Sequence, residues 1–144
     1  MDLTRFITPC GATLLLFAAT ASAEPKGVWL NEAGNLEIEI VECGPNLCGL
    51  VEWIAQDQPA QDVNNPDPTL RQRPMVGLRI LEELAPDGED TWKGEIYNRV
   101  NGKTYRCKMR VLGPDRLEIR GYIGLPLFGA SQVWTRRELG DTRS

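Results

Sequence analysis

The side chains with the most scope for chemistry in this sequence gather in one stretch, residues 62–77. It reads D-V-N-N-P-D-P-T-L-R-Q-R-P-M-V-G and is dense in Asn, Asp and Arg, without the alternation of a strand. This composition is typical of a lid or binding edge, or of a rigid loop whose Asn and Asp side chains bond to their own backbone. Its candidate ligand-binding or interface residues are Asp62, Asn64, Asn65, Asp67 and Arg73.

The first half of this stretch matches a calcium-binding loop only in part. Asp62 and Asn64 place oxygen ligands at the first and third positions. Pro66 stands at the fifth position, where another ligand is needed, and Asp67 at the sixth, where such loops need glycine. We therefore predict no metal site.

Catalytic groups are scarce, because the chain contains no histidine. That removes the commonest general base, the Ser-His and Cys-His nucleophile pairs and the usual zinc and copper ligands. Of the paired carboxylates, Glu37 and Glu39 are expected on the solvated face of a strand, opposite the basic stripe of residues 106–110. A histidine-free enzyme using Asp62 and Asp67 is the least favoured hypothesis. We predict a protein that is not an enzyme and that needs no cofactor.

The cysteines predict one disulfide, as expected for a protein in an oxidising compartment. The segment Cys43-Gly44-Pro45-Asn46-Leu47-Cys48 predicts a four-residue turn with the two cysteines facing each other across the first rung of a hairpin. A disulfide over so short a loop contributes about 2 kcal/mol and mainly fixes the register. A redox-active pair is less favoured, because the spacing is not C-x-x-C. Cys107 is expected to be a buried, unpaired thiol.

The N-terminus reads as a signal peptide over residues 1–23. A short start with Arg5 precedes an apolar run, residues 11–19, and Ala21-Ser22-Ala23 forms an A-x-A cleavage signature. The apolar run is shorter than the ~20 residues of a membrane span, which argues against a transmembrane anchor. A buried N-terminal strand or helix is the alternative. We predict cleavage after Ala23, a periplasmic or secreted protein, and one domain over residues 24–144.

The net charge of the chain is −4. A domain that binds nucleic acid needs a basic footprint, so the acidic excess argues against nucleic acid as a partner.

Short alternating segments bounded by turns predict an all-β fold. Leu36, Ile38 and Ile40 alternate with glutamates, and Asn101-Gly102 is a strong hairpin signal. Eight strands are expected, over residues 27–30, 36–41, 50–55, 78–81, 92–97, 104–111, 117–122 and 132–136. This pattern favours a single small antiparallel up-and-down barrel. An eight-stranded barrel is either filled by side chains or holds one small ligand, and the pattern does not decide between the two.

The connection over residues 57–75 is predicted to hold one short helical turn. Asp67 is placed as its N-cap and Pro68 at its first position, and Pro74 would stop it.

Side chains expected inside the barrel are the other candidate ligand-binding residues. The alternation points Ile38, Trp53, Tyr105, Met109 and Ile119 inward. The apolar segment Gly124–Gly129 is either a ligand portal or membrane-touching loop beside the mouth, or a connection that folds over the barrel end; the second account is favoured.

Several pieces of the sequence resemble a family of small exported bacterial proteins known as a domain of unknown function. The matching pieces span the mature chain: Gly27-x-Trp29, the Cys43–Cys48 turn, Asp62-Val63-Asn64-Asn65-Pro66-Asp67, Arg73-Pro74 with Gly77, Gly94 with Tyr97, Gly102-Lys103-x-Tyr105, Leu117–Gly121 and Gln132-x-Trp134-Thr135-Arg136. The resemblance implies a lipocalin-like, calyx-type barrel.

In the lipocalin pattern, the tryptophan of a G-x-W at the barrel base packs under an arginine from near the chain end. The resemblance therefore implies structural roles for Gly27, Trp29, Trp134 and Arg136, with Arg136 or Arg137 as the cation–π partner.

The leading functional hypothesis is an exported barrel that binds a small apolar or amphipathic molecule. The alternative is a filled barrel that acts as a structural or interaction module of the cell envelope, through the loop Asp62–Arg73. Under that alternative, the partner is an envelope protein.

Overall fold

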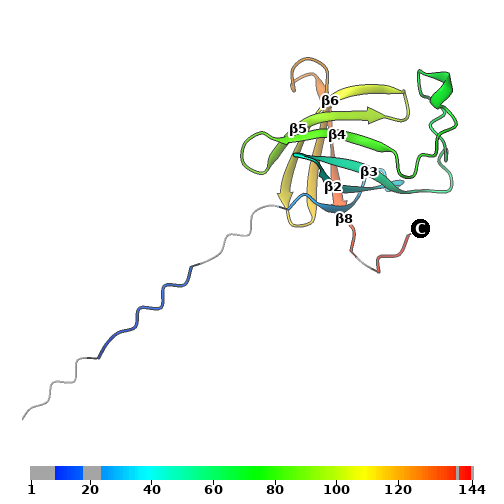
Figure 1. Ribbon diagram of the computed structural model, residues 1–144. Coiled ribbons are helices and arrows are strands. Elements are labelled where there is room, and N and C mark those ends of the chain that lie inside the picture. Colours follow the sequence, from blue (N-terminus) through cyan, green and yellow to red (C-terminus); the bar gives the residue numbers. More distant parts are fainter. Residues whose placement is uncertain (1–8, 18–23, 139, 144) are drawn as a thin grey trace, which may run out of the picture.

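The computed structural model describes residues 9–17, 24–138 and 140–143, and within it eight strands close into one barrel (Figure 1). The strands are β1 (Gly27–Leu30), β2 (Leu36–Cys43), β3 (Asn46–Ile54), β4 (Arg79–Pro86), β5 (Thr91–Asn98), β6 (Lys103–Gly113), β7 (Arg116–Tyr122) and β8 (Gly129–Arg136). Each strand is antiparallel to its chain neighbour, and β1 pairs with β8 to close the barrel. The predicted all-β up-and-down barrel is confirmed.

The long connection between β3 and β4 contains the predicted helical turn, as a 3₁₀ helix, η1 (Pro68–Leu70). Its N-cap is Asp67, whose side chain accepts a hydrogen bond from the Thr69 backbone N–H, and Pro68 opens the turn. Both residues act as the sequence predicts.

The N-terminal region is described only in part. Leu14, Leu15, Leu16 and Phe17 are exposed and belong to no strand or helix. The expected cleavage site at Ala21-Ser22-Ala23 and the basic start at Arg5 lie outside the described residues. In the part of the chain that the structure describes, no helix is both long and apolar enough to cross a membrane.

The two ends of the barrel differ in their connections. The β1–β2, β3–β4, β5–β6 and β7–β8 connections lie at one end, which we call the mouth, because the strands alternate in direction around the barrel. The remaining connections and the residues flanking β1 and β8 outside the barrel lie at the other end, the base. Side chains fill the lower barrel densely, with Trp29, Leu81, Met109 and Leu117 fully buried.

The base is closed by Arg136. Its guanidinium lies 4.2 Å from the ring centre of Trp29, so the predicted cation–π pair is confirmed, with Arg136 rather than Arg137 as the partner. Arg136 also donates to the backbone carbonyl groups of Glu24 (2.6 Å), Lys26 (2.7 Å) and Pro114 (2.7 Å). Gly27 is required beside it, because a Cβ there would lie 2.6 Å from the guanidinium.

The predicted position of Glu37 is wrong. Its side chain is buried rather than solvated, and it pairs with Arg137 (3.0 Å) and Arg143 (3.1 Å). Arg137 and Arg143, which follow β8, lie against the outer face of β2 and cover this carboxylate. The basic stripe on β6 is not opposite it, because β6 pairs with β5 and β7.

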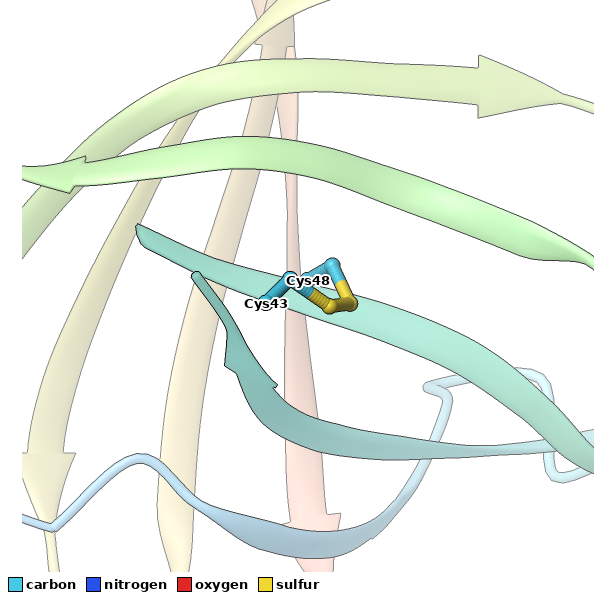
Figure 2. Close-up of a disulfide and its surroundings, with 2 residues drawn as sticks. All are labelled: Cys43 and Cys48. Carbon is cyan, nitrogen blue, oxygen red and sulfur yellow. A yellow bond between two sulfur atoms is a disulfide. The ribbon is translucent and has the colours of Figure 1, made fainter. Parts of the chain in front are cut away.

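The Cys43–Cys48 disulfide is confirmed, with a Cα–Cα distance of 5.7 Å (Figure 2). The expected four-residue turn is not formed. Cys43 pairs with Asn46 and Cys48 with Val41, so the cysteines are diagonal neighbours on one face and the turn has only two residues. Gly44 makes this possible with a φ of 68°, since a two-residue hairpin that also contains a proline needs glycine at its first central position.

Arg136 gives a direct test of barrel closure. Replacing Arg136 with Ala removes three hydrogen bonds and the cation–π contact, and we expect the free energy of unfolding to fall by about 2–3 kcal/mol in urea titrations. Arg136→Lys should recover little of this, because an ammonium cannot reach three carbonyl groups in a fork. Arg116→Ala, an exposed arginine at the same end, is the matched control. Equal stability of the Arg136 and Arg116 variants would contradict this account.

Candidate functional site

A cavity of about 440 Å³ lies at the mouth of the barrel, above the packed lower half. This volume falls within the range of small-molecule sites. Its apolar wall is formed by Leu36, Ile80, Ile96, Tyr97, Val100, Tyr105, Ile119, Gly121, Ala130 and Trp134. Its polar side chains are Asn31, Asn98, Arg99 and Gln132.

Small residues on β7 and β8 keep this space empty. Gly121 pairs with Ala130, and both line the cavity. A Cβ at Gly121 would meet Ile96 and Tyr105 at 3.5 Å and 3.9 Å, an ordinary contact distance that a larger side chain would extend into the cavity. The barrel is therefore filled at its base and hollow at its mouth.

The β3–β4 connection carries a buried carboxylate beside this cavity. Asp62 is fully buried and accepts hydrogen bonds from Tyr97 Oη (2.6 Å), Asn65 Nδ2 (2.8 Å) and Arg73 Nε (2.8 Å). A second guanidinium nitrogen of Arg73 also lies 2.8 Å from it. We call Asp62, Asn65, Arg73 and Tyr97 the clasp. It joins the connection to β5, since Tyr97 lies on that strand.

The contacts of the clasp shift the pKa values of Asp62 and Tyr97. Burial alone would raise the pKa of Asp62, but the hydrogen bonds from Tyr97, Asn65 and Arg73 and the Arg73 charge outweigh it and hold the pKa below its ordinary value. Burial, together with the bond to Asp62, raises the pKa of Tyr97 to about 12. The phenol therefore stays protonated as a donor, and Asp62 stays ionised as an acceptor.

The same connection holds the cavity wall at the β5–β6 turn. Asn64 Nδ2 donates to the Arg99 carbonyl (3.2 Å), and the Arg99 guanidinium donates to Gln58 Oε1 (3.1 Å). Gly102, with a φ of 71°, packs directly against the Asn64 carbonyl, where no Cβ would fit. Tyr97 and Arg99 line the cavity, so the connection positions part of the wall of the site.

The candidate residues from the sequence fall into separate groups. Tyr105 lines the cavity, as does Trp134, while Met109 is buried in the packed core below it. Asp62, Asn65 and Arg73 form the clasp, Asn64 binds Arg99, and Asp67 caps η1 and also accepts from Thr69 Oγ1 (2.7 Å).

The inward placement of Trp53 is wrong. A bulge between Glu37 and Ile38 shifts the β2–β3 register, so Val51 faces Ile38 while Trp53 faces Glu37. The extra residue, Glu52, turns Trp53 out of the interior. Trp53 is half-buried in an outer groove that Arg143 also lines.

Arg99, Asn98 and Gln132 line the cavity, although no sequence pattern marks them as binding residues. Asn98 and Arg99 fall in the predicted hairpin connection before residue 104, and Gln132 begins the last predicted strand. Only the register of the closed barrel brings them to one space.

The apolar connection between β7 and β8 does not fold over the barrel end. Leu125, Leu127 and Phe128 are exposed by 63%, 79% and 65%. Arg120 holds the segment in shape by donating to the carbonyl groups of Pro126 and Gly129.

A closed eight-stranded up-and-down barrel with an arginine-sealed base and a hollow mouth is a lipocalin-like calyx. Residues 27–136 match the family described as "Uncharacterized protein conserved in bacteria (DUF2147)", and the chain belongs to this family. Among solved structures it is similar to protein HP1028 from the human pathogen Helicobacter pylori, which is described as belonging to the lipocalin family. The TM-score is 0.73 at 23% identity, over 81% of this chain and 85% of that chain. No curated protein matched the sequence.

The clasp makes a prediction about acid stability. Because the pKa of Asp62 is lowered by folding, its contribution is present above its ordinary value of 3.8 and is lost as pH falls below that value. We expect Tyr97→Phe to cost about 2 kcal/mol near neutral pH, since it removes a hydrogen bond to a charged acceptor. In the Asp62→Asn variant, the decline in stability below pH 3.8 should be shallower. Urea titrations across the acid range measure both effects.

Asp57→Asn is the control for this test, because Asp57 is exposed in the same connection. If Asp57→Asn flattened the acid profile as much as Asp62→Asn, the clasp would not be the source of the pH dependence.

Proposed function

We propose that this protein binds a small apolar or amphipathic molecule in the mouth cavity. The observation that carries this proposal is the 440 Å³ space with a mainly apolar lining, in a barrel whose lower half is filled. Burial of an apolar ligand surface in such a space is favourable by about 25 cal/mol per Å². The lipocalin-like fold supports the same role.

The chemistry of the clasp supports a binding role over a catalytic one. The Asp62 carboxylate is enclosed by donors from three side chains, and Asp67 is committed to capping η1. Neither carboxylate is among the residues that line the mouth cavity. A general base must reach a proton on a bound substrate, and these two groups are held away from one.

The second candidate function is binding to a partner protein of the cell envelope. The exposed β7–β8 connection is a better contact site for such a partner than the loop Asp62–Arg73. The polar side chains of that loop bind one another, whereas Leu125, Leu127 and Phe128 offer apolar surface to a partner. Exposed apolar side chains that gather in one segment are typical of contact sites.

We also propose export, supported by the signal-peptide pattern of residues 1–23 and by the disulfide, which persists in oxidising compartments. After expression of the full chain in a bacterial host, intact-mass analysis of the periplasmic fraction should give a protein that begins at Glu24. A protein found only in the cytoplasm, with residues 1–23 retained, would refute export.

Ligand binding in the mouth cavity can be tested by placing a larger side chain at position 121. Gly121→Leu should extend a side chain between Ile96 and Tyr105 into the cavity and weaken the binding of an environment-sensitive apolar fluorophore at least tenfold. Gly113→Leu is the matched control, because Gly113 has open space around it and lies at the base. Retained binding in Gly121→Leu, with an unchanged urea midpoint, would place the fluorophore elsewhere and count against the proposal.

A further inference from the structure

Three polar side chains around the mouth cavity, Gln132, Asn98 and Tyr105, each accept a hydrogen bond within the protein and keep a donor group unused. Gln132 Oε1 accepts from the indole N–H of Trp134 at 3.0 Å. Because an indole nitrogen only donates, the amide must present its oxygen to Trp134. Among the described residues, nothing accepts from Gln132 Nε2, so this donor is available to a ligand.

Asn98 and Tyr105 also accept a hydrogen bond within the protein and keep a donor unused. Asn98 Oδ1 accepts from the backbone N–H of Val100 at 2.9 Å, which fixes the amide with Nδ2 as the unused end. Tyr105 Oη accepts from Asn101 Nδ2 at 2.8 Å, and the orientation of Asn101 is set because its Oδ1 accepts from the Lys103 N–H. The Tyr105 hydroxyl proton is therefore left to donate.

Arg99 adds a positive charge to this set. It is half-buried, and the described part of the chain gives its guanidinium one acceptor, the neutral Gln58 Oε1. No carboxylate is found within its reach in the ion pairs of the described residues. A partly desolvated guanidinium without a counter-ion is electrostatically uncompensated. Burial also lowers the pKa of Arg99, in agreement with this.

No acidic side chain is among the residues that line the cavity within residues 24–138. The cavity therefore combines apolar walls with four side chains that have unused donor groups: Arg99, Asn98, Tyr105 and Gln132. A ligand head group that fits must accept hydrogen bonds, and a negative charge on it would also pair with Arg99.

We propose that the ligand is an anionic amphiphile, with a carboxylate or phosphate head group at Arg99 and an apolar tail against Ile96, Ile119 and Trp134. This inference rests on the proposed binding function and specifies the ligand class for the same cavity. A neutral alcohol would leave the Arg99 charge unpaired, and an amine would repel it.

The experiment compares four probes with the same tail: dodecanoate, dodecyl phosphate, dodecanol and dodecylamine. The affinity of each probe is measured by displacement of the apolar fluorophore from the full mature protein at neutral pH. Each probe is used below its own critical micelle concentration. We expect one of the anions to bind about tenfold more tightly than dodecanol, which corresponds to one charge-assisted contact. Arg99→Gln should remove this preference, measured as the ratio of anion affinity to dodecanol affinity in the same variant, and Arg99→Lys should keep part of it.

Arg106→Gln is the control, because Arg106 is exposed on β6 and does not line the cavity, yet the variant loses the same charge. Equal binding of anion and alcohol, or tightest binding of the amine, would overturn the head-group inference and leave the binding function standing. An anion preference that survives Arg99→Gln would also overturn it. Failure of all four probes and of the fluorophore to bind would instead refute the proposed function.

Discussion

The barrel depends on a short seam between β1 and β8. Strand β1 has four residues, and only Trp29 and Leu30 pair with β8. Arg136 adds side-chain contacts to this seam. Its guanidinium donates to three backbone carbonyl groups on both sides of the closure and stacks on Trp29. One side chain thus satisfies backbone acceptors that a longer strand would have paired. The glycine two residues before Trp29 leaves the space for it.

A closed base allows the other end to be open. The lower half of the barrel is filled by Trp29, Leu81, Met109 and Leu117, and these give the fold its apolar core. The walls of the mouth then need support from outside the barrel rather than from a filled interior. The clasp gives that support: Asp62 binds Tyr97 on β5, and Asn64 binds the Arg99 carbonyl in the next turn.

The sequence predicts those features that depend on local pattern. Alternation and turn residues locate all eight strands, Asp67-Pro68 locates η1, and the short cysteine spacing locates the disulfide. Features that depend on register are missed. A one-residue bulge reverses the face of Trp53, because side chains in a strand alternate with period two. The cavity itself is a non-local property, since β6 and β7 separate Arg99 from Gln132 along the chain and the two residues line one space only once the sheet has formed.

The polar side chains of the β3–β4 connection help to keep this segment out of the mouth cavity beside it. An apolar connection of this length would gain free energy by folding into the mouth and filling it. Asp62, Asn65 and Arg73 instead satisfy one another and Tyr97. A shift of the connection would break the three hydrogen bonds that Asp62 accepts and its ion pair with Arg73, which costs more than a single apolar contact gains. The clasp therefore favours a single position of the connection, and the mouth stays hollow.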